Sequence, residues 1–348
     1  MPIFEALGDG YEQIVFGHDN ATGLKTIIAI YSTARGPALG GTRFYPYPDE
    51  DSAFQDALRL GKAMAYKAAC ADLALGGGKA VIIGDPSASK TPELIEAYAR
   101  VVDSLGGRYL TCADVGTDAD DLDVIGKVTP HVTGTHAGSG DPSPVTAYGI
   151  WHGMRAVAEE ALGDTTLSGK HVVVVGTGKV GGDLARRLAT EGARLTLSDV
   201  HTPAVEALAK QLGARVVPPD IAHAVECDVF APCALGGILN AETIPELACK
   251  AVAGAANNQL LTPEDGERLA ARGILYAPDF VINAGGLINA EDERHGYDSE
   301  RAHKKAAGIA DTLRLIFSRS KQEGCTPAEA ADRLAEDRIA EATRARGW

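Results

Sequence analysis

The chain has 348 residues, a hydrophobic content of 45% and a formal net charge of −14. This length allows two domains with separate cores, and the acidic balance argues against nucleic acid or an anionic membrane as a partner. No apolar stretch reaches the length that spans a bilayer, and residues 1–5 lack the basic and apolar regions of a secretory signal. We therefore expect a cytoplasmic protein.

The six cysteines are scattered, at positions 70, 112, 227, 233, 249 and 325. None forms a Cys-x-x-Cys pair, and no cluster with histidine has the spacing of a zinc site. We expect free thiols and no bound metal.

The first part of the chain mixes predicted strands and helices. β-Branched residues and short apolar runs indicate the strands, and apolar residues at helical spacing indicate the helices. Strands are expected at residues 13–15, 26–31, 81–83 and 109–111, and helices at 52–70 and 91–105.

A loop rich in Gly, Ser and Pro at residues 134–144 is the best candidate linker. After a helix at 145–160, strands and helices alternate strictly, which predicts a parallel sheet with helices on both faces. The strands are expected at 171–175, 194–198, 229–231, 250–253 and 274–277. Residues 299–348 predict two helices broken near 324–327, the last of which returns to the first domain.

The run Gly76-Gly77-Gly78-Lys79 leaves one lysine beside a backbone without side chains. Such a backbone can approach a ligand closely. Lys67, at the end of the preceding helix, adds a second ammonium group, and the two together suggest an anionic substrate. A glycine hairpin with two solvated lysines is the alternative reading.

The sequence Gly176-Thr177-Gly178-Lys179-Val180-Gly181 follows a run of valines directly and opens a helix. This context predicts a dinucleotide site, because Gly176 allows the tight turn, Gly178 the close approach of a pyrophosphate, and Gly181 close helix–strand packing. The helix N-terminus favours the phosphates. Asp199 ends the next strand, where its carboxylate favours NAD over NADP, although a helix cap or turn residue would look the same.

These observations predict an α/β fold with two domains. Residues 1–138 form an α/β domain for substrate binding and catalysis, with residues 320–348 packed on it, and residues 139–319 form a Rossmann-like NAD-binding domain. Asp114, in a turn of small residues after a buried strand, is a candidate general acid or base. An Asx-turn residue is the alternative.

Several segments resemble, in order and over nearly the whole chain, the amino-acid dehydrogenases that act on glutamate, leucine, valine and phenylalanine. They are the motifs at residues 39–44, 64–67, 76–79, 114–117, 143–149, 176–181, 254–258 and 283–286. The resemblance implies reversible, NAD-dependent oxidative deamination of an L-amino acid to a 2-oxo acid and ammonia. It also implies a homo-oligomer, with the first domain as the oligomerisation domain.

The resemblance also implies roles for individual residues. Lys67 would bind the substrate α-carboxylate, Lys79 would polarise the carbonyl oxygen and activate water, and Asp114 would shuttle protons. The substrate pocket would be lined by Gly40, Gly41, Met64 and Asn258, and the residues near the nicotinamide and its ribose would include Thr146, Asn257 and Asn283.

The side-chain end of the substrate is expected to be apolar. Glutamate dehydrogenases of this family carry a lysine where this chain has Leu39, and an unpaired buried carboxylate is costly. Cys112 and Leu287 match positions that shape the pocket, and together suggest a modest size suited to valine, leucine and isoleucine. An aromatic substrate such as phenylalanine remains open, and a non-catalytic sensor of NAD and amino acids is a remote alternative.

Overall fold

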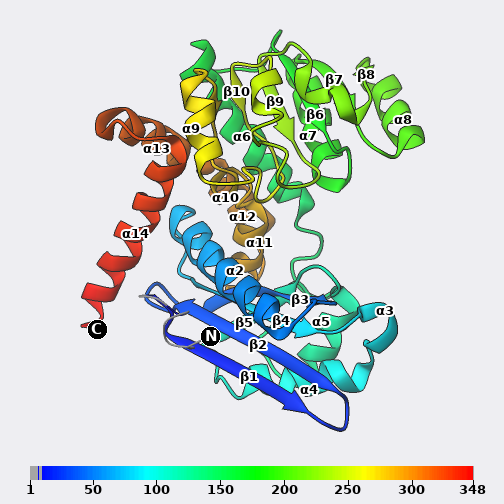
Figure 1. Cartoon of the computed structure of the whole chain (residues 1–348), viewed down its shortest axis with the longest axis vertical. Coiled ribbons are helices and arrows are strands. Elements are labelled where there is room, and N and C mark those ends of the chain that lie inside the picture. The colour runs from blue at the N-terminus through cyan, green and yellow to red at the C-terminus, as the bar shows by residue number, and fades with distance from the viewer. Residues whose placement is uncertain (1–6, 8–9, 348) are drawn as a thin grey trace. The chain divides into compact units, whose positions relative to one another are not determined.

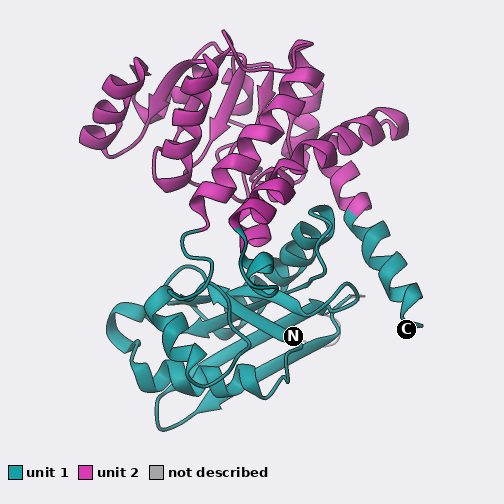
Figure 2. Ribbon diagram, turned by 180° about the vertical axis from the view of Figure 1, so that it is seen from behind, with its two compact units in different colours: residues 1–141, 290–298, 335–348 teal, residues 142–289, 299–334 magenta. Residues whose placement is uncertain are grey.

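Two β-sheets, each with its own core, organise the chain (Figure 1). The structure, a computed structural model, describes residue 7 and residues 10–347. It divides into unit 1, which comprises Met1–Asp141, Ala290–Asp298 and Ala335–Trp348, and unit 2, which comprises Pro142–Asn289 and Ser299–Leu334 (Figure 2). The sequence predicts boundaries after residues 138 and 319, so the division falls three residues later at the first boundary and keeps residues 320–334 in unit 2.

Unit 1 is built on a mixed five-stranded sheet in the order β1-β2-β4-β3-β5. Strands β1 (Gln13–Asp19) and β2 (Leu24–Ser32) are antiparallel, as are β2 and β4 (Gly76–Ile83). The strands β4, β3 (Ala38–Tyr45) and β5 (Tyr109–Ala113) run parallel to one another. The parallel strands therefore end at the same edge of the sheet.

Helices cover both faces of this sheet. On one face, α2 (Glu50–Cys70) packs on β2 and β4 through Phe54 and Leu58. On the other face, α4 (Pro92–Asp103) and α5 (Ala119–Gly126) close a larger core, and α3 (Pro86–Ser89) precedes them. Asp49 caps α2 by accepting a hydrogen bond from the Ser52 amide (2.6 Å), which explains why the helix starts two residues before the predicted position.

The glycine run lies inside a strand, not in a ligand-binding loop or a hairpin. Residues 76–79 form the first half of β4 and are buried. A Cβ atom added to Gly77 would fall 1.9 Å from the Ala65 nitrogen of α2, so the missing side chain lets helix and strand touch main chain to main chain. The expectation of a strand limited to 81–83 was wrong because glycine is rare in strands and hid the pattern.

Unit 2 is a doubly wound fold around a six-stranded parallel sheet in the order β11-β10-β9-β6-β7-β8. This is the 3-2-1-4-5-6 order of dinucleotide-binding folds. The expected strands are present as β6 (His171–Val175), β7 (Arg194–Ser198), β9 (Val229–Pro232), β10 (Ala251–Val252) and β11 (Leu275–Tyr276), with β8 (Arg215–Val216) added at one edge. The helices α6 (Ser143–Leu162), α7 (Lys179–Glu191), α8 (Thr202–Leu212) and α9 (Glu264–Ala271) follow the predicted alternation.

The C-terminal part contains more helices than predicted. The short α10 (Asp279–Ile282) is followed by α11 (Gly285–Glu293), α12 (Ser299–Ala307), α13 (Ile309–Glu323) and α14 (Pro327–Ala345). Gly308 separates α12 from α13, and Gly324 in the left-handed conformation ends α13. The end of α14 joins unit 1, as expected: Arg338 donates hydrogen bonds to the Ala69 (2.8 Å) and Cys70 (2.9 Å) carbonyls.

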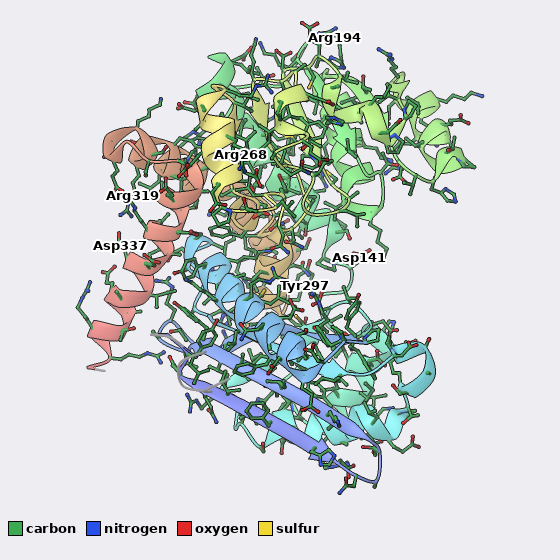
Figure 3. All side chains as sticks on the ribbon, viewed as in Figure 1. Asp141, Arg194, Arg268, Tyr297, Arg319 and Asp337 are labelled. Carbon is green, nitrogen blue, oxygen red and sulfur yellow. The ribbon has the colours of Figure 1, made fainter. Side chains whose placement is uncertain are left out.

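Arg194 of β7 and Arg268 of α9 are exposed residues (Figure 3), and Arg268 pairs with the buried Asp265 (2.6 Å). No helix of the described residues is long and apolar enough to cross a membrane. The expected absence of a secretory signal concerns residues 1–5, which lie outside the described part of the chain.

Candidate active site

Three parallel strands of unit 1 place predicted site residues on the same face of the sheet. Gly41 of β3 lies opposite Cys112 of β5 in the strand register. A Cβ atom added to Gly41 would lie 3.3 Å from Lys79 Nζ and 2.8 Å from Asp114 Cβ. Side chains alternate between the two faces of a strand, so β3, β4 and β5 bring these four residues together.

Lys79 and Asp114 form a close ion pair. Lys79 Nζ lies 2.5 Å from Asp114 Oδ2, and Lys79 is only 6% exposed. Burial alone would raise the pKa of Asp114, but the Lys79 ammonium and the Arg43 guanidinium favour the carboxylate and hold that pKa below its usual range. The pair therefore presents an ionised carboxylate beside a buried ammonium.

The structure adds three residues to which the sequence analysis gave no role. Arg43 Nε lies 3.3 Å from Asp114 Oδ2, and Arg43 Nη1 lies 2.9 Å from Asp56 Oδ2 on α2. Tyr47 donates a hydrogen bond to the same Asp56 oxygen (2.7 Å). The position of Arg43 two residues after Gly41, on the same face of β3, was the one signal available in the sequence.

The other predicted substrate residues occupy different positions around this centre. Leu39 is buried on β3, and Met64 and Lys67 are half-buried near the end of α2, whose turn at Ala65 touches β4. Gly40 faces the opposite side of the sheet, where a Cβ atom would lie 1.8 Å from the Gly78 carbonyl oxygen and its own carbonyl accepts the Tyr109 hydroxyl (2.6 Å). Gly40 can therefore contribute to a pocket only through its main chain.

Cys112 is partly buried, and burial raises the pKa of its thiol to about 11. The Lys79 ammonium opposes this shift, while Asp114 and Glu293 add to it. Cys112 is therefore a neutral thiol at physiological pH and acts as a space-filling side chain. All six cysteines are free, as expected.

In unit 2, the predicted dinucleotide loop joins β6 to α7. Gly176 has φ +94°, and a Cβ atom on Gly181 would lie 2.0 Å from the Gly176 carbonyl oxygen. A Cβ atom on Gly178, the N-cap of α7, would meet open space among the described residues. The space beside Gly178 is thus open at the helix start formed by Lys179 and Val180, which fits a pyrophosphate at this helix N-terminus.

Asp199 lies at the end of β7 beside this loop. Its Oδ2 accepts hydrogen bonds from the Thr177 amide (2.6 Å) and hydroxyl (3.1 Å), and its Oδ1 accepts one from the His201 amide (2.9 Å). Slight burial favours the neutral form and would raise the pKa of the Asp199 carboxyl. The hydrogen bonds outweigh this effect and lower that pKa. The carboxylate is ionised and keeps lone pairs that could accept ribose hydroxyls.

The remaining predicted residues gather in a second cluster of unit 2. Asn283 donates hydrogen bonds to the Ala255 carbonyl (3.0 Å) and to Asn257 Oδ1 (2.7 Å). Its own Oδ1 is buried without a hydrogen-bond partner among the described residues, so it can accept from a ligand. Thr146 adjoins Gly285 and Gly286, where Cβ atoms would lie 2.6 Å from its Cα and 3.2 Å from its Oγ1.

Two further positions in unit 2 complete the predicted set. Asn258 is exposed and has φ +51°, a conformation that asparagine adopts more readily than most residues. Leu287 is buried on α11, within the part of that helix that belongs to unit 2.

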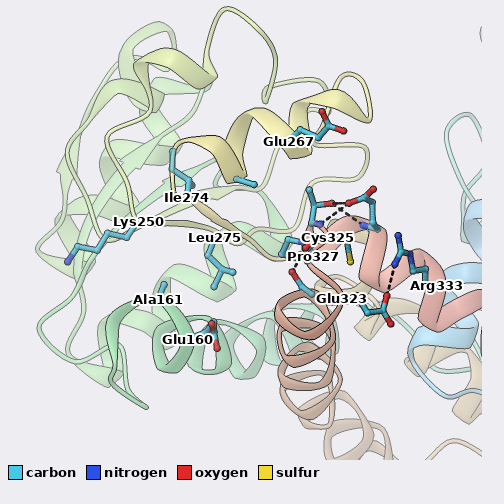
Figure 4. Close-up of a pocket in the computed structure, with 16 residues that line it drawn as sticks. Glu160, Ala161, Lys250, Glu267, Ile274, Leu275, Glu323, Cys325, Pro327 and Arg333 are labelled. Atoms are coloured by element: carbon cyan, nitrogen blue, oxygen red, sulfur yellow. Dashed lines mark hydrogen bonds and ion pairs between the residues drawn. The ribbon is translucent and has the colours of Figure 1, made fainter.

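A pocket of about 860 Å³ elsewhere in unit 2 contains none of the predicted site residues (Figure 4). Residues of α6, α9, α13 and the start of α14 line it. Glu323 in its wall pairs with Arg333 (2.6 Å), and Glu329 accepts the Thr326 amide (2.7 Å). These polar groups satisfy one another, which gives the pocket no evident ligand chemistry.

Comparison with known proteins agrees with this arrangement. Residues 12–131 match the family "Glu/Leu/Phe/Val dehydrogenase, dimerisation domain", and residues 197–347 match "Glutamate/Leucine/Phenylalanine/Valine dehydrogenase". The chain is 50% identical over 344 residues to leucine dehydrogenase of Bacillus cereus, covering 98% of this chain and 94% of the relative. It is 51% identical over 346 residues to valine dehydrogenase of Streptomyces albus, covering 98% and 95% of the two chains.

Among solved structures, the L-tryptophan dehydrogenase of Nostoc punctiforme is similar, with a TM-score of 0.89 and 46% identity over 98% of this chain and 99% of that one. The predicted fold class and the predicted family are thus confirmed. Membership of this family implies a nicotinamide cofactor and a small amino-acid substrate. The chain therefore belongs to the Glu/Leu/Phe/Val dehydrogenase family and is an amino-acid dehydrogenase that acts on a CH–NH2 group.

Proposed function

We propose that the protein catalyses the reversible, NAD-dependent oxidative deamination of branched-chain L-amino acids to 2-oxo acids and ammonia. The observation that carries the proposal is the buried Lys79–Asp114 pair beside Gly41, which places no side chain of its own next to Lys79 Nζ. Unit 1 would be the substrate-binding and catalytic domain, and unit 2 the NAD-binding domain.

The residues of unit 1 suit the proton and charge transfers of this reaction. The Lys67 ammonium would bind the substrate α-carboxylate. The ionised Asp114 would accept a proton from the substrate amino group and return it later. The Lys79 ammonium would stabilise negative charge on the oxygen of the water that adds to the substrate carbon. Asp114 must be ionised before it accepts a proton. The positive charges of Lys79 and Arg43 favour this ionised form.

The residues of unit 2 suit NAD as the nicotinamide cofactor, which when bound supplies the hydride acceptor. The open N-terminus of α7 at Gly178 would receive the pyrophosphate. Asp199 would accept the adenosine ribose hydroxyls, and its negative charge would repel a 2′-phosphate. Thr146, Asn257 and Asn283 would contact the nicotinamide and its ribose, which agrees with the unpartnered Asn283 Oδ1.

The choice of a branched-chain substrate depends on the apolar pocket residues. Leu39 is 1% exposed and cannot pair with a substrate carboxylate. The two relatives of about 50% identity named above are a leucine and a valine dehydrogenase. The similarity to an L-tryptophan dehydrogenase is the observation that keeps an aromatic substrate as the second candidate.

We further propose that the protein is a homo-oligomer assembled through unit 1. The support is the description of the family that matches residues 12–131 as a dimerisation domain. Light scattering coupled to gel filtration of the full chain tests this proposal, and a monomeric mass would contradict it.

The test of the proposed reaction is NADH formation at alkaline pH with each L-amino acid, in parallel with NADP. Valine, leucine and isoleucine should give the highest kcat/KM values, with NAD well above NADP. A preference for phenylalanine or tryptophan would favour the aromatic alternative. No absorbance change with any amino acid would overturn the proposal in favour of a sensor.

A further inference from the structure

Arg43 stands between two carboxylates that belong to different elements. Its Nε lies 3.3 Å from Asp114 Oδ2 after β5, and its Nη1 lies 2.9 Å from Asp56 Oδ2 on α2. Both Lys79 and Arg43 reach the same oxygen of Asp114. We infer that Arg43 is a positioning residue, which holds the Asp114 carboxylate in place and is itself held by Asp56 and Tyr47.

The contacts of Asp56 fix the guanidinium group of Arg43. Asp56 Oδ2 accepts from both Arg43 and the Tyr47 hydroxyl (2.7 Å), while Asp56 Oδ1 accepts from Arg59 Nη2 (2.8 Å). Asp56 is therefore held by three donors at two oxygens. A carboxylate so fully engaged is a rigid anchor, and it orients the plane of Arg43 toward Asp114.

The geometry requires an arginine. The planar guanidinium presents several N–H groups in a fixed fork, so two of its nitrogens can meet two carboxylates at once. A lysine ammonium at this position is a single point charge and would have to choose between Asp56 and Asp114. The sheet supports the contact, because Arg43 and Gly41 lie on the same face of β3 and Gly41 adjoins Asp114 Cβ.

The charges around Asp114 come from every element of unit 1 packed near it. Lys79 of β4 and Arg43 of β3 are cationic, Cys112 of β5 is a neutral thiol, and helix α2 contributes Asp56, Arg59 and Lys67. Glu293 of α11 acts on Cys112. The network contains two positive and two negative charges, which belong to Lys79, Arg43, Asp56 and Asp114. Loss of Arg43 would leave one negative charge in excess beside Asp114, the group that transfers protons.

The inference rests on the proposed function, since it assigns Arg43 to the reaction through Asp114. The test compares Arg43→Gln, Arg43→Lys and the matched control Arg59→Gln. Arg59 also contacts Asp56, but its side chain is 57% exposed and, within the described part of the chain, its ion pair is with Asp56 and not with Asp114. The quantity measured is the pH profile of kcat/KM for leucine with NAD. A nearby positive charge favours an ionised carboxylate, so removal of Arg43 should move the acidic limb to higher pH by about one unit.

We expect kcat/KM at neutral pH to fall roughly 10- to 100-fold in Arg43→Gln, as for a misplaced catalytic group. Arg43→Lys should recover part of the loss. Arg59→Gln, which removes the donor to the other Asp56 oxygen and leaves the Arg43–Asp114 contact in place, should change the profile no more than Tyr47→Phe does. Tyr47→Phe keeps the ring and removes one donor to Asp56. This variant should move the acidic limb of the pH profile slightly to higher pH, and it replaces Arg43→Gln as the test if Arg43→Gln does not fold.

A wild-type profile in Arg43→Gln, or an equal loss in Arg59→Gln, would overturn the inference. A second readout does not need turnover: the Asp114 carboxyl titration followed by ¹³C NMR in aspartate-labelled protein, assigned against Asp114→Asn. An unshifted titration in Arg43→Gln would also overturn it. Absence of any wild-type dehydrogenase activity would count against the proposed function alone, whereas the carboxyl titration would still decide whether Arg43 controls Asp114.

Discussion

Gly77 of β4 lies directly against Ala65 of α2, so closely that a methyl group on Gly77 would fall 1.9 Å from the Ala65 nitrogen and 2.2 Å from its Cα. The helix turn at this contact also carries Met64 and Lys67, and the strand carries Lys79. Gly77 therefore sets the distance between the two elements that hold the predicted substrate-binding lysine and the predicted catalytic lysine. Gly76 and Gly78 are close to other main chain: their added Cβ atoms would lie 1.9 Å from the Ser32 carbonyl oxygen and 2.8 Å from the Ala29 carbonyl oxygen of β2. Close packing of main chain, rather than the approach of a ligand, accounts for the three glycines.

Replacing Gly77 with alanine should destabilise the protein, because both neighbouring groups are backbone and cannot rotate away. Overpacking of this kind costs about 1–3 kcal/mol, and the misplacement of α2 should also lower kcat/KM. Urea denaturation and steady-state kinetics measure the two effects. Gly126→Ala on α5, where a Cβ atom would meet nothing closer than 3.7 Å, is the control and should be neutral or slightly stabilising. Equal stability of the two variants would contradict the packing argument.

Much of unit 2 was predictable because its signals are local. A run of valines, a glycine loop and a helix follow one another in the sequence. Each strand that was predicted there lies within about two residues of its expected position, whereas the two-residue edge strand β8 was not predicted. Unit 1 was harder. Strand β3 was missed because Gly40 and Gly41 have little strand propensity, although the pairing of β3 with both β4 and β5 overrides that preference.

The candidate site divides in the same way. Lys79 and Asp114 were predicted from motifs, and the structure brings them together. The Arg43–Asp56 contact joins a strand to a helix, and no periodic pattern links residues 43 and 56. Such a contact depends on how α2 lies on the sheet, so only the folded structure could supply it.

Removal of Lys79 and removal of Lys67 should change different kinetic constants. Lys79→Ala should lower kcat by at least about 100-fold, because the lost ammonium acts on charge that develops during the reaction. Lys67→Ala should mainly raise KM for the amino acid, since it removes binding energy common to the ground and transition states. Lys62→Ala, which removes an exposed α2 lysine over the Tyr66 ring, is the control. Near-native turnover in Lys79→Ala would contradict the assignment.

The stability contributed by Asp114 should depend on pH in one direction. Its pKa is lowered in the folded protein, so its contribution is complete above the unfolded value of about 3.9 and is lost as the pH falls through the folded value. Asp114→Asn leaves Lys79 buried without its carboxylate and should cost about 3 kcal/mol at pH 7. The difference in unfolding free energy between wild type and variant should stay constant from pH 7 to about 5 and shrink below about 4. A difference that grows on acidification would contradict this sign.

Asp199 should control the choice between the two nicotinamide cofactors. Asp199→Asn removes the negative charge, retains the side-chain shape and keeps an oxygen that can accept the Thr177 amide. KM for NAD should rise about tenfold, or about 1.4 kcal/mol, and the ratio of NAD to NADP efficiency should fall. The control is Asp183→Asn, which removes the negative charge from the ion pair between Asp183 and Arg187 on α7. An unchanged cofactor ratio would show that Asp199 serves only as a loop cap.

Cys112 offers the sharpest test of the substrate side of the pocket. It lies opposite Gly41 on the face that carries Asp114, and its buried, neutral thiol fills space without ionising. Cys112→Gly should open room for an aromatic ring. The ratio of the kcat/KM for phenylalanine to that for valine should rise by about 10- to 100-fold, which is the usual effect of one or two buried heavy atoms on substrate discrimination. Glycine also weakens a strand by about 1 kcal/mol, so Cys112→Ala, which keeps the strand propensity closer to that of cysteine, separates strain from space. If the ratio stays the same in both variants while valine turnover persists, the substrate side chain does not reach Cys112, and the apolar limit of the pocket must lie with Leu39 and Met64.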